Sequence, residues 1–449
     1  MLLDSAKVVA GVMLIIGGAQ AQVGNNAAPP PPPGWTSGSA GQGAHVIIPP
    51  SSIPGPDDGG KRAHTNIREL VPNGPAKPQA GVARPLVGPP VPGTFYETPA
   101  SLACIYRLVP VTPGCDPNTV TTVSNRGSKV IAIVDAFDNP SALADLTKYS
   151  AQFGLPAPTP ANFQVVYARG VQPKSEPGWT LEEALDIEMA HALAPNAKVI
   201  LVEAASDSDA EILFAEDVAS GLVAAAGGGE VSNSWSDYEF AGQLALDTHF
   251  STPKVVYFAS TGDSPGVNWP STSANVVAVG GTSTSRWPFT GAFRWESSYP
   301  EGGGGVSAFV PRPAYQNSIS SIVGAQRGVP DVSADAYPFT GVWVFCTGNC
   351  GQIINDWHIV GGTSVSSPLF AAMTNAAGRF APSTASELAT IYANNAPVQF
   401  FGATGRFNKI IHGVCGPYAG FTTPAANGLA NPLWNYCTGV GSPKGLSGL

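Results

Sequence analysis

Charged side chains are scarce in this sequence of 449 residues, at 12% of the total, whereas hydrophobic residues make up 43%. That balance excludes a disordered or fibrous chain and indicates a globular protein. Basic residues are fewer than acidic ones, 22 against 31, and the net charge is -9. Because no basic stripe is present, we expect neither nucleic acid nor an anionic membrane surface as a partner.

Long apolar runs are also missing, since no segment reaches the roughly 18 to 20 apolar residues that a transmembrane helix needs. The shorter apolar run at residues 8–17 precedes Ala19-Gln20-Ala21, a small-x-small sequence typical of a signal-peptide cleavage site. We therefore expect residues 1–21 to be a signal peptide, the alternative being a buried N-terminal helix. The mature protein is then expected to be a secreted monomer, extracellular or periplasmic, without a membrane span.

The sequence has only six cysteines, and an even number in an exported chain favours disulfide bonds. Neighbours in the sequence form the expected pairs, which are Cys104 with Cys115, Cys346 with Cys350, and Cys415 with Cys437. A metal site is the alternative, but no histidine lies at zinc-ligand spacing from these pairs.

Residues 22–94 are rich in proline, glycine and small polar residues. Such a segment cannot bury enough apolar surface to offset its ordering entropy, so we expect a linker or a loosely folded pro-segment. From residue 95 to residue 449, short β-branched runs alternate with amphipathic segments. Strands are predicted at 130–134, 163–167, 198–203, 230–234, 255–260 and 276–279, and helices at 141–152, 181–193 and 210–226. This alternation predicts one α/β domain, with a parallel sheet covered by helices on both faces.

Ser364 follows a Gly-rich turn and precedes a helical run, in Gly362-Thr363-Ser364-Val365-Ser366-Ser367-Pro368. A serine at the start of a helix is exposed to backbone amides and to the positive end of the helix dipole, which suits an attacking hydroxyl. The alternative is an ordinary N-cap. Gly-Thr-Ser alone is a weak signal.

Histidine is the usual base for a serine nucleophile, and it is rare here. Two of the six histidines fall in the low-complexity segment, and none lies in a His-Gly-Thr-His type of sequence. The base must therefore be sought among other residue types.

A predicted helix supplies two carboxyl groups. Glu182 and Asp186 are i,i+4 neighbours and share one face, whereas His191 lies on the opposite face and is expected to pack. We expect Thr180 and Glu183 to form a capping box at the helix start. The alternative for the carboxyl pair is a solvated surface pair. Two carboxylates on one face repel, however, so that one pKa rises and the pair can replace histidine as a base in acid.

These residues resemble the sedolisin family of serine-carboxyl peptidases, relatives of the subtilisins, over roughly residues 95–445. The combination is specific, because several stretches occur in the order of that family. They are Glu182-x-x-x-Asp186, Val231 to Trp235, Gly262-Asp263-Ser264, Ala278 to Thr282, Val329 to Asp335 and Gly362-Thr363-Ser364-x-x-x-Pro368.

The resemblance implies a secreted, subtilisin-like endopeptidase that cleaves peptides through an acyl-enzyme and favours acidic pH. It makes Ser364 the nucleophile, Glu182 the general base and acid, and Asp186 the group that orients Glu182. Asp263, otherwise a common turn residue, would donate a hydrogen bond to the oxyanion in its protonated form.

The resemblance further implies that one stretch pairs with the substrate backbone by β-addition, namely Ser232, Asn233, Ser234 and Trp235. It also implies a calcium site near the C-terminus, but Lys409 and Asn435 stand where acidic ligands are expected. Because calcium needs negatively charged oxygen ligands, we expect this ion, and any other metal or cofactor, to be absent. The Cys415–Cys437 bridge could tether the region instead.

Two other functions stay open. Asp135 resembles the strand-end aspartate of a subtilisin triad, so a Ser-His-Asp peptidase is one alternative, although a turn acid after a strand explains Asp135 equally well. A secreted, non-catalytic protein that keeps the fold is the other. The family has a folded pro-domain before the peptidase domain, whereas this chain has only a short low-complexity segment before residue 95. This difference is compatible with a non-catalytic protein.

Overall fold

The computed structural model describes residues 44–72, 87–350, 356–395, 405–416, 418–419 and 434–449. A central sheet runs in the order β12-β11-β9-β7-β4-β6-β5, with β15 beside β11. All neighbours in it are parallel except β11 and β12. Its strands are β4 (Val130–Ala136), β5 (Phe163–Tyr167), β6 (Lys198–Ala204), β7 (Gly229–Asn233), β9 (Val255–Ser260), β11 (Val277–Arg286), β12 (Phe293–Ser298) and β15 (Val332–Asp335).

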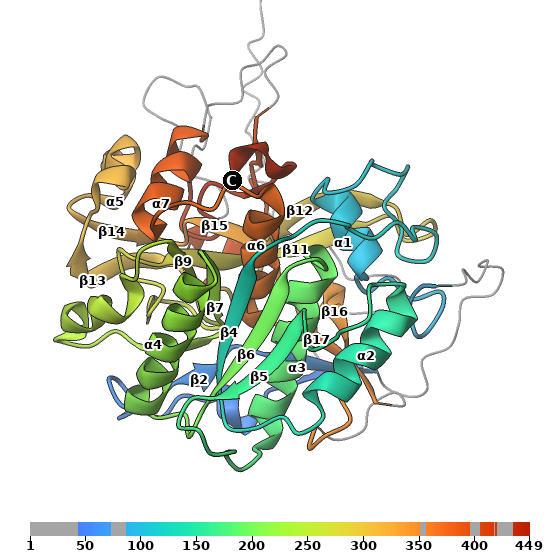
Figure 1. Cartoon of the computed structure of the whole chain (residues 1–449). Helices are drawn as coiled ribbons and strands as arrows, with labels where there is room; N and C mark the ends of the chain where they lie inside the picture. The colour runs from blue at the N-terminus through green and yellow to red at the C-terminus, as the bar shows by residue number, and fades with distance from the viewer. Residues whose placement is uncertain (1–43, 73–86, 351–355, 396–404, 417, 420–433) are drawn as a thin grey trace, which may run out of the picture.

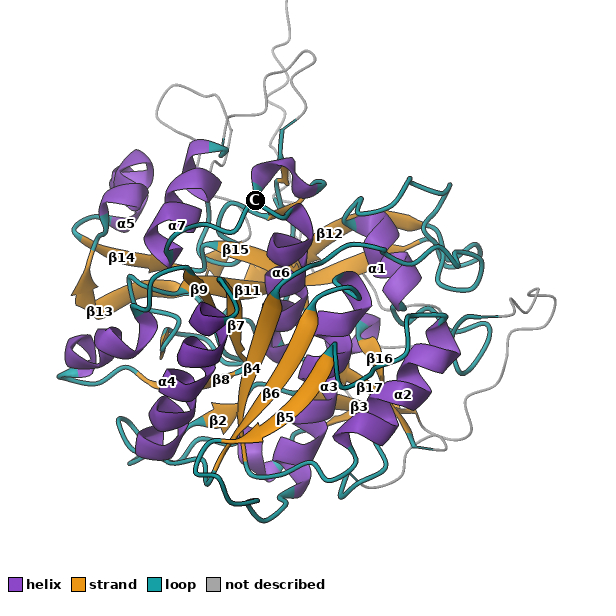
Figure 2. Cartoon of the chain, viewed as in Figure 1, coloured by secondary structure: helices purple, strands orange, loops and turns teal. Residues whose placement is uncertain are grey.

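Helices cover both faces of this sheet (Figures 1 and 2). They are α1 (Pro99–Ile105), α2 (Ala142–Phe153), α3 (Pro177–Leu193), α4 (Asp209–Ala225), α5 (Ser320–Val323), α6 (Thr363–Ala377) and α7 (Thr384–Ala393). The 3-10 helices are η1 (Pro50–Ser52), η2 (Gln243–Phe250), η3 (Ala314–Ile319), η4 (Pro338–Thr340) and η5 (Leu446–Gly448).

Smaller sheets surround this core. One has the order β1-β3-β17-β16 and another the order β10-β8-β2. The remaining pairs are β13 with β14, β18 with β21 and β19 with β20. These strands are β1 (Ala44–Ile47), β2 (His64–Thr65), β3 (Arg68–Pro72), β8 (Trp235–Tyr238), β10 (Asn268–Trp269), β13 (Gly305–Pro311), β14 (Gln326–Val329), β16 (Val342–Phe345), β17 (Trp357–Gly361), β18 (Phe407–Asn408), β19 (Val414–Cys415), β20 (Tyr418–Ala419) and β21 (Ser442–Pro443).

Alternation along the strands divides the core into two layers. Ile131 and Ile133 of β4 pack with residues of α1, α2, α3 and α6, whereas Val130, Ala132 and Val134 pack with residues of α4. Strand β4 is therefore buried on both faces, which is why its sequence reads as a continuous apolar run. The predicted parallel α/β fold is confirmed.

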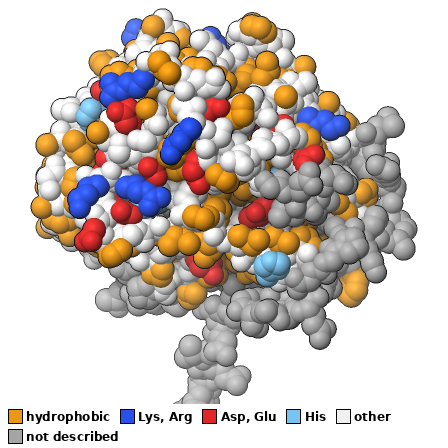
Figure 3. Space-filling model, turned by 90° about the horizontal axis from the view of Figure 1, so that it is seen from below, with side chains coloured by type: hydrophobic (Ala, Val, Ile, Leu, Met, Phe, Trp, Pro, Cys, Tyr) orange, Lys and Arg blue, Asp and Glu red, His pale blue; other side chains and the backbone are white. Residues whose placement is uncertain are grey.

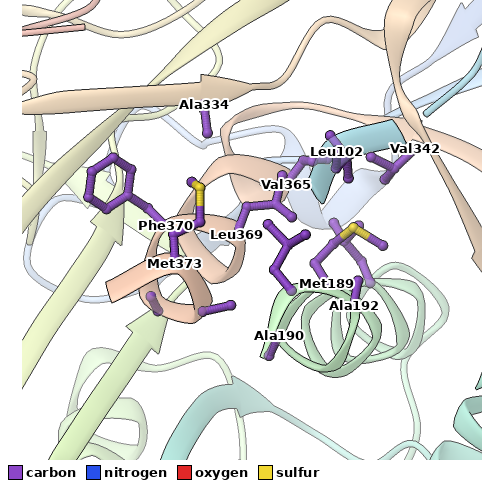
Figure 4. Close-up of a cluster of buried hydrophobic side chains, with 14 of the residues drawn as sticks. Leu102, Met189, Ala190, Ala192, Ala334, Val342, Val365, Leu369, Phe370 and Met373 are labelled. Carbon is purple, nitrogen blue, oxygen red and sulfur yellow. The ribbon is translucent and has the colours of Figure 1, made fainter. Parts of the chain in front are cut away.

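The two helices that carry the candidate residues pack directly against each other. Val365 and Leu369 of α6 face Met189 and Ala190 of α3 within one apolar cluster (Figure 4). Because protein interiors are close-packed, this contact fixes the distance between the first turn of α6 and the face of α3.

Residues 44–72 differ from the expectation for the Pro/Gly-rich segment. They form β1, β2 and β3, and β3 pairs with β17 while β2 pairs with β8. Ala63, Ile67 and Leu70 are fully buried. The part of the segment that the structure describes is thus packed into the fold, because strands from distant parts of the chain supply partners that local composition does not reveal. The expected start of the domain at residue 95 stays a prediction.

All three predicted disulfides are present, linking Cys104 with Cys115, Cys346 with Cys350, and Cys415 with Cys437. The predicted signal peptide lies outside the described residues. Within the described part of the chain, no helix combines the length and the apolar character needed to cross a membrane.

Candidate active site

The candidate site lies at the carboxyl ends of the parallel strands, at the lower end of the sheet in Figure 1, where β2 also lies. Seen from that side, acidic side chains lie among basic ones and form no large patch of one sign (Figure 3). Loops beyond these strand ends collect functional groups from distant parts of a chain in sheets of this kind.

Ser364 lies in the first turn of α6 and is fully buried. Its hydroxyl donates to the carbonyl oxygen of Ser234 at 2.9 Å and accepts from the backbone N–H of Asn66 at 3.1 Å. Its own N–H donates to the carbonyl oxygen of Asn66 at 3.2 Å. Gly362 caps the helix with a φ of 105°, a conformation that favours glycine.

The carboxyl pair on α3 is buried, so the alternative of a solvated surface pair is wrong. Asp186 accepts a hydrogen bond from the Ser234 hydroxyl at 2.8 Å. Neither carboxyl oxygen of Glu182 has a hydrogen-bond partner among the described residues. Burial raises the pKa of Glu182 well above its usual range, and the charges of Asp186 and then Asp135 raise it further; the nearby Ser364 hydroxyl offsets part of the rise.

The predicted capping box is wrong. The helix α3 begins a turn earlier, at Pro177, with the Glu176 side chain accepting from the N–H of Trp179 at 3.0 Å. Thr180 lies inside the helix, and Glu183 is buried, with a pKa raised first by burial and then by the charge of Glu203.

Asp135 adds a third carboxyl group to the pair. It lies near the end of β4, is fully buried, and has no hydrogen-bond partner among the described residues. Burial raises the pKa of Asp135 to about 8, and its charge raises those of both Glu182 and Asp186. The sequence shows that Asp135 lies at the end of a predicted strand. It does not show that Asp135 lies close enough to Glu182 and Asp186 to raise their pKa values.

Asp263 follows β9 and bonds to Thr363, the residue before Ser364. One carboxyl oxygen accepts from the N–H of Thr363 at 2.7 Å and from its hydroxyl at 3.0 Å. The other has no hydrogen-bond partner among the described residues, and the Arg68 guanidinium lies 3.7 Å away. Burial raises the pKa of Asp263 to about 6, with the charge of Arg68 as the largest opposing effect.

The predicted substrate-pairing stretch is divided between two strands. Ser232 and Asn233 lie in β7, both edges of which are occupied by β4 and β9, so this part leaves no edge for a peptide. Trp235 begins β8, which pairs with β10 on one side and with β2 on the other. The edge of β8 follows Ser234, whose carbonyl oxygen bonds to Ser364, and the chain's own residues 64–65 occupy it.

Histidine takes no part in the hydrogen bonds of Ser364 that the described residues make. His191 is buried, and its Nε2 lies 2.8 Å from the carbonyl oxygen of Pro156, as expected of a packing residue. His358 instead contacts Glu69 at 2.5 Å.

No family model matches the chain. Over 331 residues it is 31% identical to kumamolisin from Bacillus sp. (strain MN-32), an alignment that covers 67% of this chain and 56% of that protein. It is also 31% identical over 194 residues to sedolisin from Pseudomonas sp. (strain 101), with 40% of this chain and 29% of that protein covered. The matched part of the chain thus spans little more than half the length of kumamolisin and less than a third of that of sedolisin.

Among solved structures, the chain is similar to Pseudomonas sedolisin, a serine-carboxyl proteinase, in complex with two molecules of pseudo-iodotyrostatin. The TM-score is 0.59 at 22% sequence identity, and the match covers 78% of this chain and 95% of that one. This likeness shows the fold, and the identities above add the sequence relationship. The chain belongs to the sedolisin family.

Proposed function

We propose that this protein is an endopeptidase that hydrolyses peptide bonds through a serine acyl-enzyme, with carboxyl groups in place of histidine. One observation carries the proposal. The hydroxyl of Ser364 lies at the start of α6, beside the buried carboxyl groups of Glu182 and Asp263. Peptide and protein chains are its proposed substrates.

In the proposed mechanism, Ser364 attacks the carbonyl carbon of the scissile bond while Glu182 accepts its proton. Burial, and then the neighbouring carboxyl groups of Asp186 and Asp135, raise the pKa of Glu182 and thus its affinity for that proton. The N–H of Ser364 and the protonated carboxyl of Asp263 donate to the oxyanion. Glu182 then protonates the leaving amine, and water hydrolyses the acyl-enzyme by the same route in reverse.

Replacing the nucleophile tests this proposal. Ser364→Ala should lower kcat/KM for an unstructured peptide by about 10³-fold or more, because the covalent step is lost. Ser366→Ala is the matched control, since Ser366 is a buried serine of the same helix whose hydroxyl donates to the Thr363 carbonyl at 2.7 Å. Undiminished hydrolysis by Ser364→Ala would contradict the proposal.

The alternatives receive less support. A Ser-His-Asp mechanism needs a histidine bonded to Ser364, and His191 bonds elsewhere. A non-catalytic role is disfavoured because Ser364, Glu182, Asp186 and Asp263 are all retained.

We also propose that the calcium site of the family is replaced here by protein groups. The ammonium of Lys409 donates to the Val440 carbonyl at 3.0 Å and to the side chain of Asn395. The side-chain amide of Asn435 donates to the Ile410 carbonyl at 3.1 Å. N–H donors thus occupy oxygens that could otherwise serve as ligands, and the described residues contain no group of three or more His, Cys, Asp or Glu side chains suited to a metal ion. These residues do not fit calcium.

Acidic working conditions and secretion complete the proposal. An acidic environment is supported by Asp263, whose carboxyl group must be protonated in order to donate. Secretion is supported by the signal-like start of the sequence and by the three disulfides, and we propose that the secreted protein is a monomer.

A further inference from the structure

Residues 64–69 of the chain cross the candidate site in an extended conformation. On one side of Ser364, β2 pairs antiparallel with β8, with Thr65 opposite Trp235. On the other side, β3 pairs antiparallel with β17, with Arg68 opposite Gly361. The segment therefore lies against the site as a peptide added by β-addition would lie.

Asn66 is the residue of this segment that meets the nucleophile. Its N–H donates to the Ser364 hydroxyl and its carbonyl oxygen accepts from the Ser364 N–H. A Cβ atom added to Gly362 would collide with this carbonyl oxygen and also lie against the unpartnered oxygen of Asp263. The Asn66 carbonyl thus points at the two groups assigned to the oxyanion, and the peptide bond beside it is Asn66–Ile67.

The side chain of Asn66 is held at both ends of its carboxamide. Its Nδ2 donates to the Ser260 hydroxyl at 2.8 Å, and its Oδ1 accepts from the Ser236 hydroxyl at 3.0 Å. Asn66, Ser236 and Ser260 are all buried. A leucine of similar size would leave both hydroxyls unpaired in a buried place, which is costly.

The flanking residues fix the position of the segment. The Arg68 guanidinium donates to the Asp263 carbonyl at 2.9 Å, and the Thr65 hydroxyl lies 2.7 Å from that of Ser51. A cavity of about 160 Å³ adjoins Asn66 and is lined by Ser236 and Asp263 on the side of the site. The segment thus occupies the place that an external peptide would need.

We infer that the pocket formed by Ser236 and Ser260 selects asparagine before the scissile bond, and that the first bond cleaved is the chain's own Asn66–Ile67 bond. The inference rests on the proposed peptidase function. Ser364 Oγ bonds to the Asn66 carbonyl carbon and its proton passes to Glu182. The carbon–nitrogen bond to Ile67 then breaks, and Glu182 returns the proton to the Ile67 amine. Water hydrolyses the resulting ester, which frees the carboxylate of Asn66 and restores Ser364.

Mass spectrometry of the full chain at acidic pH tests the self-cleavage. We expect a fragment that begins at Ile67 in the wild type and in the control Asn125→Leu, which changes an exposed asparagine. We expect none in Ser364→Ala and at least about a 10²-fold slower appearance in Asn66→Leu. A first cut elsewhere, or equal rates for Asn66→Leu and Asn125→Leu, would overturn the inference.

Two peptides that differ only in Asn or Leu before the scissile bond separate this inference from the proposed function. We expect kcat/KM to favour the Asn peptide by about 10²-fold or more, and Ser260→Ala to reduce that ratio about 10-fold. If both peptides are cleaved equally and Ser364→Ala cleaves neither, the asparagine pocket is refuted and the peptidase stands. If the wild type and Ser364→Ala hydrolyse both peptides at the same rate, the proposed peptidase function itself is refuted.

Discussion

At the scale of single residues, Asp263 illustrates how burial sets the chemistry of the site. One of its oxygens is fixed by Thr363, while the other is left without a hydrogen-bond partner among the described residues. Because burial raises its pKa to about 6, the carboxyl is a donor in acid and loses its proton as the pH rises through that value. The proposed activity should therefore decline above about pH 6.

Lys409 is a second buried ionisable residue, and its charge bears on whether calcium stabilises the protein. Burial lowers the pKa of Lys409 to about 8, so below that pH its ammonium carries the charge that an ion would bring. We predict that calcium at millimolar concentration leaves the melting temperature unchanged in thermal unfolding. Since an ion that binds only the folded chain raises its stability as the ion concentration exceeds the dissociation constant, a large calcium-dependent rise would contradict this prediction.

At the scale of elements, the first turn of α6 depends on the glycine that precedes it. We predict that Gly362→Ala abolishes most activity, because the added Cβ meets the backbone of Asn66 and the carboxyl of Asp263. Gly378→Ala is the matched control at the other end of α6, with a φ of 72° and open space around it. It should cost about 1 kcal/mol of stability from backbone strain alone and keep its activity.

Peptide hydrolysis and thermal unfolding of both variants check this prediction. If Gly362→Ala and Gly378→Ala lose activity to the same extent, the collision at Gly362 is not the cause.

The sequence predicted the elements of the central sheet well and the surrounding strands poorly. Strands β5 and β9 match the predicted ranges, and β4, β6 and β7 differ by a few residues, because buried parallel strands are continuous apolar runs. Strands β2 and β3 could not be predicted from local composition. Asn66, for example, bonds to a residue 298 positions away, and a composition rich in proline and glycine carries no sign of that partner.

The candidate residues were predictable as motifs, but their environment was not. Spacing placed Glu182 and Asp186 on one helix face, yet it could not show that tertiary packing buries that face, beside Asp135, and raises both pKa values. The capping box failed for a related reason, since Glu176 and Pro177 start the helix before Thr180 is reached. The pairing of β2 with β8 depends on tertiary contacts, so the sequence of residues 232–235 does not indicate that another part of the chain occupies this edge.

At the scale of the whole molecule, buried carboxyl groups link stability to acidity. Burial raises the pKa of several side chains to about 8 or about 9, among them Asp135, Glu203, Asp209 and Glu230. Below about pH 4 such a group is protonated in both the folded and the unfolded chain. As the pH rises toward the folded pKa, only the unfolded chain releases the proton, so folding loses about 1.4 kcal/mol per pH unit for each fully shifted group.

We therefore predict that the melting temperature falls between pH 4 and pH 8. The variant Glu230→Gln removes one of these groups outside the candidate site and should make the decline shallower. A melting temperature that rises over the same range would refute the assignment of these carboxyls as protonated and buried.

The most direct test of the central claim is the pH dependence of kcat/KM for peptide hydrolysis between pH 3 and pH 8, measured for the wild type and for Glu182→Gln. If carboxyl groups perform the catalysis, the wild type is most active in acid and declines as the pH rises through about 6, the pKa of Asp263. Glu182→Gln should then be at least about 10³-fold less active at every pH, because the base is lost. Activity that increases toward neutral pH, or that survives in Glu182→Gln, would contradict the account.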